Sequence, residues 1–474
     1  RSLRQSGDSL YSAVGILSEQ PSRVGRTIRG VDVLGTVSDL EKVFAELKKG
    51  GTPPRRLILT KDEIKGAPVR DLLERTAALG MTLARVPRPT DFRDAADRVE
   101  IKPVAIEDIL GRPQTPLERS AMEALIKGRR VAVTGAGGSI GSELVRQIAA
   151  FEPASLSLIE NNEYALYSID HEIATSHPSL ARAAVIADVR DRARIADVLE
   201  RIRPELVFHA AALKHVPLVE DNPAEGVRTN AGGTVNVADA CIAAGVATMV
   251  QISTDKAVNP TSVMGASKRA AEMYCQALDL ENGDGVCRFV TVRFGNVLGS
   301  TGSVVPLFQR QLERGGPLTV THPDITRYFM TVREAVELVL QAAALENATP
   351  RERGGITVLD MGEPVKIVDL ADRMIRLAGL EPGKDIQIAF TGLRPGEKLH
   401  EELFHGAETL EATEIPAIRR AHPRTADHAL IERGLDELEA AARSRQMVAT
   451  VEILGRMVPE YESGTAKVVA AEGS

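Results

Sequence analysis

Long apolar runs are missing from this chain of 474 residues. A helix that crosses a bilayer needs about 18 or more apolar residues in succession, and a signal peptide needs a shorter apolar core near its start. The sequence has neither. Its three cysteines, Cys241, Cys275 and Cys287, form no CxxC pair, which argues against a disulfide framework. The chain as given is therefore expected to lie in the reducing cytoplasm.

Signatures of metal and nucleic-acid binding are missing as well. The nine histidines form no HxxxH motif and no Cys/His cluster, so we expect no metal site. No basic stripe is interleaved with aromatic residues, and the net charge is −7, which argues against a nucleic-acid partner. What the chain does have is the composition of a globular protein, at a length that suggests more than one domain.

The first part of the chain alternates strand-like and helix-like segments. Strands are expected at 31–35, 56–60 and 82–86, and helices at 39–49 and 69–79. This alternation is typical of a small α/β domain, and it predicts a Rossmann-like module over residues 1–110. Pro113 and Pro116 interrupt the segment that follows, which we interpret as a linker over 111–124.

A second α/β unit is expected from residue 125 to about 420. Its strands are apolar on both faces and alternate with helices, which indicates a parallel sheet covered on both sides. The predicted fold class is therefore α/β, a doubly wound parallel sheet with a smaller lobe from about residue 295. Residues 421–474 are expected to form two helices, at 428–442 and 447–457, and a tail. The strands are expected at 129–134, 157–159, 184–187, 206–209, 248–253 and 288–293.

Three glycines, Gly135, Gly138 and Gly141, lie between the first of these strands and a helix. Glycines there allow a tight turn and a close approach of the backbone to a pyrophosphate, which the helix N-terminus attracts. Ser139 and Ile140 fall in the same turn. The pattern predicts a dinucleotide site, and the alternative is a domain that uses its glycines for packing alone.

Glu160 ends the next strand, at the position from which a carboxylate binds the ribose hydroxyls of a dinucleotide and repels a 2′-phosphate. No Arg or Lys stands beside it in the sequence, so we predict NAD rather than NADP as the cofactor. Asp188 and Val189 follow the third strand, where they can meet the adenine. Ala210 and Ala211 follow the fourth, where small side chains let the cofactor lie close.

These motifs resemble the extended short-chain dehydrogenase/reductase superfamily. Its TGxxGxxG pattern begins at Thr134, and its later signatures begin at Ala210 and Asn230. Within the superfamily, the stretch 252–268 and the sequence Arg394-Pro-Gly-Glu-Lys are similar to the bacterial nucleotide-sugar 4,6-dehydratases, in particular the large form with an N-terminal membrane-anchored module. The resemblance covers residues 125–420 and supports a catalytic domain with those bounds.

The resemblance implies an NAD-dependent enzyme that converts UDP-N-acetylglucosamine to the 4-keto-6-deoxy sugar. A hydride moves from carbon 4 to NAD and on to carbon 6, and water is lost. It also implies a homo-oligomer, held at the cytoplasmic face of the bacterial inner membrane by transmembrane helices that this chain lacks. A UDP-hexosamine 4-epimerase and a non-catalytic nucleotide-sugar sensor remain alternatives. The choice between the gluco and galacto substrates, and the configuration at carbon 5, stay open.

By resemblance, Asp255 is the acid for the carbon 6 hydroxyl, Lys256 is the base at carbon 5, and Thr254 contacts the carbon 4 oxygen. A lysine base needs a lowered pKa, which we expect from desolvation by the sugar and the nicotinamide and from nearby Lys268. Met264 stands where the superfamily has its tyrosine base. The carbon 4 proton therefore goes either to Asp255 through Thr254 or to an ordered water. Lys268 is expected to hold the nicotinamide ribose.

The substrate side is also assigned by resemblance. Cations and amide donors suit a nucleotide diphosphate, and planar Arg suits phosphate in particular. Tyr274, His209 and His215 are expected to pack rather than to react. The contacts to diphosphate, uracil and ribose are expected from Lys214, Asn296, Arg327, Arg394 and Glu397.

Overall fold

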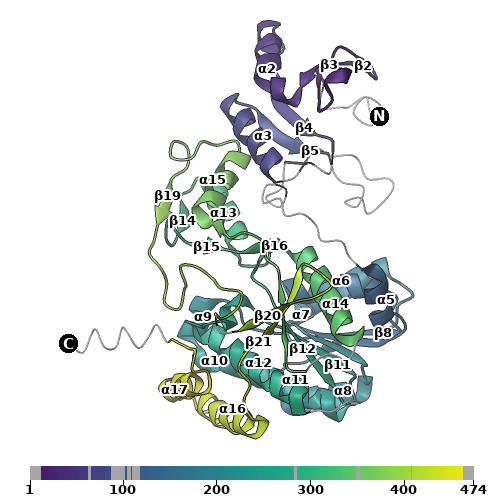
Figure 1. Cartoon of the computed structure of the whole chain (residues 1–474), viewed down its shortest axis with the longest axis vertical. Coiled ribbons are helices and arrows are strands. Elements are labelled where there is room, and N and C mark those ends of the chain that lie inside the picture. The colour runs from purple at the N-terminus through teal and green to yellow at the C-terminus, as the bar shows by residue number, and fades with distance from the viewer. Residues whose placement is uncertain are drawn as a thin grey trace, which may run out of the picture. The chain divides into compact units, whose positions relative to one another are not determined.

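The computed structural model describes residues 12–61, 64, 66–86, 102–103, 108, 118–281, 286–348, 353–406 and 408–462 (Figure 1). Residues 111–117 of the expected linker and the tail beyond residue 462 lie outside this description. The chain divides into two compact units. One comprises Arg1–Pro113, Leu307–Thr319 and Val368–Ala389, and the other comprises Gln114–Pro306, Val320–Ile367 and Phe390–Ser474.

The first unit begins with two small sheets in its described part. In one, β3 (Val31–Thr36) lies between β1 (Ile16–Ser18) and β2 (Thr27–Ile28), and α2 (Leu40–Lys49) follows. In the other, β4 (Arg56–Leu59) pairs in parallel with β5 (Thr82–Arg85) across α3 (Ala67–Ala78), and β6 (Lys102–Pro103) is added antiparallel. The helices and strands predicted between residues 31 and 86 are therefore confirmed.

The second unit, in the part that the structure describes, is built on a nine-stranded sheet. Neighbouring strands from β9 to β17 pair in parallel, and β21 and β20 extend the sheet antiparallel. This confirms the doubly wound parallel sheet, while the antiparallel extension was not predicted. In spatial order the strands are β20 (Thr409–Ala412), β21 (Ile418–His422), β17 (Ile356–Leu359), β12 (Arg288–Arg293), β11 (Thr248–Ile252), β10 (Leu206–His209), β7 (Arg130–Thr134), β8 (Ser155–Glu160) and β9 (Arg182–Ile186).

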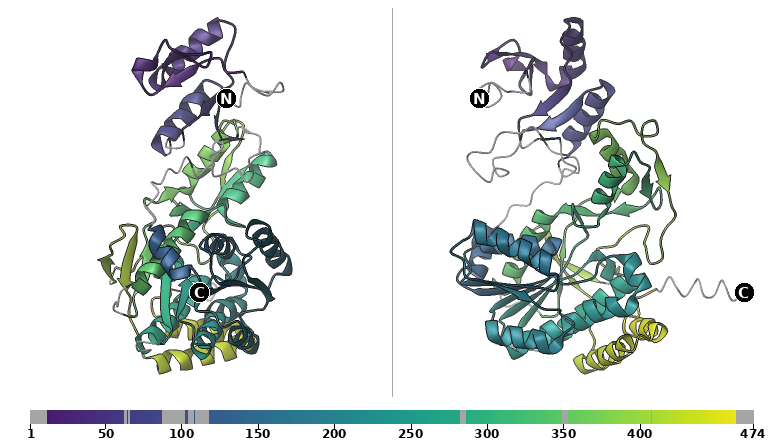
Figure 2. Two further views of the ribbon diagram at one scale, coloured as in Figure 1. Left: turned by 90° about the vertical axis from the view of Figure 1, so that its right-hand side faces the viewer. Right: turned by 180° about the vertical axis from the view of Figure 1, so that it is seen from behind.

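Helices cover both faces of this sheet, as Figure 2 shows. Strands β10 and β11 are buried at every residue, because apolar side chains leave both of their faces. One core contains side chains of α5 (Arg119–Ile126), α6 (Ser139–Ala149), α7 (Glu163–Ser176) and α14 (Val332–Ala348). The other contains side chains of α8 (Arg192–Ile202), α11 (Gly233–Ala243) and α12 (Val263–Glu281).

Helix α12 is buried from Val263 to Asp279. The two C-terminal helices, α16 (His428–Arg443) and α17 (Met447–Met457), contribute to the same core, and both were predicted from the sequence. α5 begins at Arg119, inside the segment expected to be a linker. Among the helices that the structure describes, none combines the length and apolarity of a membrane span.

Short elements complete the second unit and position its site. Strand β13 (Asn296–Leu298) pairs with β16 (Phe329–Thr331), and β15 (Thr326–Arg327) pairs with β18 (Val365–Lys366). The 3₁₀ turn η5 (Asp255–Ala257) follows β11, and a π-helical turn, η4 (Arg228–Gly232), precedes α11. The strand order reverses beside β7, so the carboxyl ends of β7 and β10 border the crevice where such sheets bind ligands.

Candidate active site

The glycine turn after β7 leaves no room for side chains. Gly135 has φ of +66°, and a Cβ there would lie 2.7 Å from the Cα of Ala211. A Cβ at Gly141 would lie 1.9 Å from the carbonyl oxygen of Gly135. Gly138 is the N-cap residue of α6. The turn therefore depends on glycine at two of the three predicted positions on steric grounds alone.

A cleft of about 640 Å³ opens beside this turn. It gathers residues that the sequence assigned to the cofactor, and it adds Arg190 and Lys214. Ser139 is committed elsewhere, since its Oγ accepts a hydrogen bond from the backbone N–H of Thr301 at 3.1 Å, and Ile140 packs against the core. The predicted cofactor residues that line the cleft are Gly135, Gly138, Glu160, Asp188, Val189, Ala210 and Ala211.

The carboxylate of Glu160 is held by backbone donors. It accepts hydrogen bonds from the N–H groups of Gly137, Asn161 and Asn162, each at 3.0 Å. These bonds fix the carboxylate at the end of β8, on the wall of the cleft. A carboxylate has about four acceptor sites, so Glu160 keeps capacity for a further donor.

No Arg or Lys stands beside Glu160 in the sequence, but the fold brings Arg190 to the same cleft wall. Its guanidinium forms ion pairs with Asp188 at 2.6 Å and with Glu225 at 2.6 Å. The hydrogen bonds from Arg190 hold the pKa of Asp188 below its usual value. Asp188 is thus an ionised partner of Arg190, and its contact with adenine stays a prediction.

Thr254, Asp255 and Lys256 form a hydrogen-bonded group at the carboxyl end of β11. The Thr254 hydroxyl donates to Asp255 Oδ1 at 2.8 Å, and Lys256 Nζ donates to the same oxygen at 3.0 Å. Asp255 is fully buried, and its Oδ2 has no hydrogen-bond partner among the described residues. The structure therefore brings the three predicted catalytic residues together around one carboxylate.

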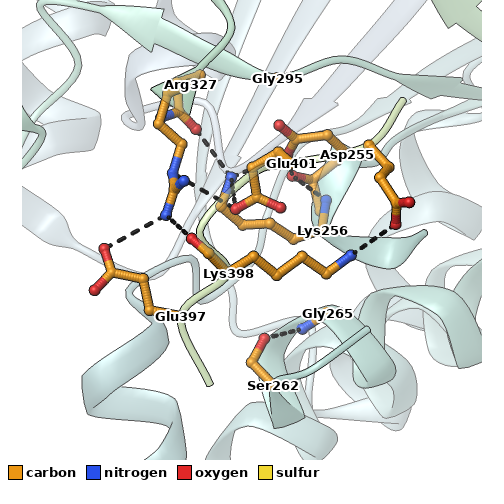
Figure 3. Close-up of polar contacts among 12 residues, drawn as sticks. Asp255, Lys256, Ser262, Gly265, Gly295, Arg327, Glu397, Lys398 and Glu401 are labelled. Atoms are coloured by element: carbon orange, nitrogen blue, oxygen red, sulfur yellow. Dashed lines mark hydrogen bonds and ion pairs between the residues drawn. The ribbon is translucent and has the colours of Figure 1, made fainter. Parts of the chain in front are cut away.

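Lys256 is more strongly paired than the sequence suggested. Its Nζ also donates to Asn296 Oδ1 at 2.9 Å and lies 3.5 Å from Glu401 Oε1 (Figure 3). Burial alone would lower the pKa of Lys256, but the carboxylates of Asp255 and Glu401 outweigh it, and the pKa is raised despite Arg327. The pKa of Lys256 is thus raised by the protein's own charges, and the fall expected when sugar and nicotinamide desolvate the amine stays a prediction.

Two glycines allow this close packing (Figure 3). A Cβ at Gly265, in the first turn of α12, would lie 2.1 Å from the carbonyl oxygen of Lys256. A Cβ at Gly295 would lie 3.0 Å from Asp255 Oδ2. The Asp-Lys turn thus packs closely against α12 and the segment before β13. A side chain at Gly265 would displace the turn, and one at Gly295 would crowd the Asp255 carboxylate.

Met264 and Lys268 lie one turn apart on α12, and both are buried. Lys268 Nζ donates to the carbonyl oxygen of Ile252 at 2.6 Å, and burial lowers the pKa of Lys268 to about 8. Lys268 thus reaches the end of β11, while its contact with a nicotinamide ribose stays a prediction. Met264 has no titratable group, so the structure offers no base at the position where the superfamily has its tyrosine.

Two of the three residues expected to pack do so, His209 and Tyr274, whereas His215 is exposed and lines the large cleft. The ring nitrogens of buried His209 pair with the hydroxyls of Thr134 at 2.7 Å and Thr234 at 3.1 Å, and desolvation lowers the pKa of His209 to about 3. The Tyr274 hydroxyl donates to Asp239 at 2.5 Å, and burial together with that carboxylate raises the pKa of Tyr274. Neither side chain replaces the missing tyrosine base.

The expected substrate residues separate into different roles. Asn296 is bonded to Lys256, and Lys214 lines the larger cleft, where its Nζ donates to Ser300 at 3.3 Å. Arg327 and Glu397 form an ion pair at 3.4 Å in the wall of a smaller cleft of about 120 Å³. Arg394 lines the same cleft and is exposed.

Sequence reasoning missed two charged residues of this smaller cleft. Glu401 lies against Lys256 and Arg327, and Lys398 Nζ donates to the carbonyl oxygen of Val258 at 2.7 Å. Lys398 is the last residue of the Arg-Pro-Gly-Glu-Lys motif that begins at Arg394, and Glu401 follows three residues later. That proximity was the available signal, because a motif that binds substrate tends to bring its neighbours into the same site.

Comparisons with known proteins agree with this geometry. Residues 131–423 match the family model described as "Polysaccharide biosynthesis protein". The chain is 42% identical, over 86% of its length, to the capsular polysaccharide biosynthesis protein CapD of Staphylococcus aureus, and it spans only 66% of that relative's length. It is 34% identical, over 58% of its length, to an inverting UDP-N-acetylglucosamine 4,6-dehydratase of Campylobacter jejuni, of which it spans 78%.

A solved structure gives the same fold. The X-ray structure of Pen from Bacillus thuringiensis is 30% identical in sequence and superposes with a TM-score of 0.56. The superposition covers 64% of this chain and 90% of Pen. The α/β fold of the chain is thus similar to that of a solved structure.

Proposed function

The chain belongs to the polysaccharide biosynthesis protein family, and on this premise we propose that it is an NAD-dependent 4,6-dehydratase of UDP-N-acetylglucosamine. The observation that carries the proposal is the group of Thr254, Asp255 and Lys256 at the end of β11. An epimerase only oxidises and reduces carbon 4. A dehydratase also needs an acid at carbon 6 and a base at carbon 5, and the Asp-Lys pair can supply both.

The large cleft fits a dinucleotide. Space at Gly135 and Gly141 is closed to any Cβ, the turn ends at the N-terminus of α6, and Glu160 presents a fixed carboxylate at the end of β8. Gly135, Gly138, Glu160, Ala210 and Ala211 would hold NAD there. When bound, NAD supplies a reversible hydride acceptor next to the sugar.

The chain's own residues move the protons. The O–H bond at carbon 4 breaks and its proton passes through the Thr254 hydroxyl to Asp255 Oδ1, a link of 2.8 Å. Asp255 then protonates the carbon 6 hydroxyl, whose C–O bond breaks to release water. Neutral Lys256 takes the proton from carbon 5 and returns it there when the hydride arrives at carbon 6. Both side chains end in the state in which they began.

This cycle requires Lys256 to enter as the neutral amine. Its raised pKa means that a proton must leave Lys256 before the carbon 5 step. Closing the site around a sugar removes water from the pair, and desolvation favours the neutral amine over the ammonium ion. The rate of dehydration should therefore rise with pH until Lys256 is deprotonated.

The test is product analysis by NMR after incubation with UDP-N-acetylglucosamine and NAD in heavy water. The 4-keto-6-deoxy sugar should form, with solvent deuterium at carbon 5 and an unlabelled hydride at carbon 6. A 4-hydroxy product with inverted carbon 4 would mean an epimerase. Absence of turnover, with NAD still bound, would favour a sensor. The galacto epimer of the substrate, assayed in parallel, decides between the two sugars.

A further inference from the structure

Glu401 is the least expected charge in the site. Its side chain is 3% exposed, and its Oε1 lies 3.5 Å from Lys256 Nζ and 3.6 Å from Arg327 Nε (Figure 3). One buried carboxylate thus bridges a cation from η5 and a cation from β15. Burying a charge is costly unless it is paired, and this pairing joins two residues with different expected tasks.

Arg327 holds Glu401 in place. Arg327 Nη1 donates to the carbonyl oxygen of Thr326 at 2.7 Å, and Nη2 donates to that of Lys398 at 2.8 Å. Nη2 also pairs with Glu397 at 3.4 Å. All three guanidinium nitrogens of Arg327 therefore have partners, either in residues 397–401 or in β15. Arg327 thus fixes residues 397–401 against the site.

One oxygen of Glu401 is left over. Its Oε2 is buried and has no hydrogen-bond partner among the described residues, as is also true of Asp255 Oδ2. An unpaired buried acceptor is destabilising, so a carboxylate that served only to pack would be unfavourable here. Both orphaned oxygens belong to the two carboxylates that contact Lys256.

Four charges face one another here. Lys256 is flanked by Asp255 from its own turn and by Glu401 from the 397–401 segment, and Arg327 of β15 lies beyond Glu401. Asn296, on β13, adds a neutral acceptor. With Lys256 protonated these four charges balance, and Glu397, which pairs with Arg327 at 3.4 Å, adds a further negative charge. Removing Glu401 would take away the negative charge nearest to Lys256 after Asp255, which disfavours the ammonium ion.

We propose that Glu401 is a positioning residue that sets the proton affinity of Lys256 and is itself held by Arg327. The proposal rests on the proposed function in one respect, because Lys256 matters as a base. The ion pairs that Glu401 forms among the described residues are with Lys256 and Arg327. Glu401 acts through Lys256: it keeps the amine beside Asp255 and determines the pH at which the amine becomes neutral.

The first experiment measures Lys256 directly and needs no substrate. Trace labelling with acetic anhydride across a pH series, read by mass spectrometry of the peptide that contains Lys256, reports its apparent pKa. In Glu401→Gln this value should fall by about 1 unit or more, since an opposite charge at this range has been removed. In the matched control Glu402→Gln it should stay unchanged, because the exposed Glu402 pairs with Asn259 and Lys398 instead.

The second experiment follows the pH profile of dehydration. In Glu401→Gln the rising limb should move to lower pH, together with a lower plateau, whereas a merely structural loss would lower the rate at every pH and leave the limb in place. Glu401→Asp keeps the charge, so its limb should stay near the native one. This variant also serves as the test of charge if Glu401→Gln does not fold.

An unchanged apparent pKa of Lys256 in folded Glu401→Gln overturns the inference, even if the native protein is a dehydratase. A labelling shift in a native protein that shows no dehydration leaves the inference standing and refutes the proposed function instead. If Glu401→Gln does not fold, the pH profile of Glu401→Asp decides. This variant keeps the charge, so a rising limb moved to lower pH by as much as the loss of a full charge would move it also overturns the inference.

Discussion

Asp255 and Lys256 carry the first prediction. Asp255→Asn keeps the size of the side chain but cannot accept the proton from Thr254, so water loss should stall. Lys256→Ala should block proton removal at carbon 5, and each change should cost about 100- to 10,000-fold in turnover. Steady-state rates and deuterium incorporation at carbon 5 measure both effects. Native turnover by Lys256→Ala would show that Lys256 is not the base.

Met264 gives the second prediction, because it is buried and has no proton to exchange. Met264→Ala should lower stability by about 2–5 kcal/mol through the cavity that it leaves. It should nevertheless retain dehydration within about tenfold of the native rate, since the carbon 4 proton is expected to leave through Thr254. Thermal melts and product NMR on one preparation separate these effects. A folded variant that binds NAD without turnover would assign Met264 a role in the chemistry.

Lys256 shows which features of the site could be predicted from the sequence and which could not. Its identity and its place after β11 were predictable, because a motif at the end of a buried strand falls in the ligand crevice. Its partners were not. Glu401 and Asn296 come from segments far along the chain, and only the fold sets their distances from Nζ. The raised pKa of Lys256 could not be foreseen for this reason, since Glu401 adds a second carboxylate that the sequence did not place there.

Packing between η5 and α12 gives the third prediction. In an ordinary helix, Gly→Ala gains up to about 1 kcal/mol. At Gly265 the new Cβ would lie 2.1 Å from a backbone oxygen, so Gly265→Ala should destabilise by about 1–3 kcal/mol and lower turnover. Gly455→Ala in α17 is the control, because its Cβ would meet its nearest neighbour only at 3.9 Å. Equal melting temperatures for both variants would contradict this view of the turn.

The elements themselves were predictable where pattern and length agreed. The largely apolar strands β10 and β11 and the amphipathic α16 carry strong signals, and the structure has each within a residue or so of its expected bounds. The pair β20 and β21 was missed because its short strands mix charged and apolar residues. The 3₁₀ turn η5 escaped prediction as well, since three residues show no periodicity.

The division of the chain into units was harder still. Residues 307–319 and 368–389 were expected in the lobe of the catalytic domain, and the structure groups them with the N-terminal residues. The local pattern of apolar residues indicates whether a segment forms a strand or a helix. It does not indicate which compact unit the segment belongs to. The domain bounds proposed from the sequence therefore follow the order of elements better than they follow the units.

The fourth prediction concerns the stability of the protein as a whole at low pH. His209 is buried as the neutral imidazole, with a pKa of about 3 in place of 6.5. Between these values the unfolded chain binds up to one more proton than the folded one. The free energy of unfolding therefore decreases as the pH is lowered, by about 1.4 kcal/mol per pH unit at most. His209→Gln removes this contribution while other titrating groups stay. Thermal melts from pH 7.5 to 4.5 should therefore show a shallower decline for the variant, and parallel curves would contradict the assignment.

The π-helical turn Arg228–Gly232 has a consequence for length variation in this chain. It places Asn230 so that its side chain bonds both backbone groups of Leu213, beside the cleft, and the hydroxyl of Ser267 on α12. Deleting one residue here would restore a regular helix and relieve the wide turn. It would also rotate one side of the turn by about 100° relative to the other and carry Asn230 away from its partners. The chain with the deletion would therefore have a regular helix but would lose the hydrogen bonds of Asn230 that hold Leu213 beside the cleft.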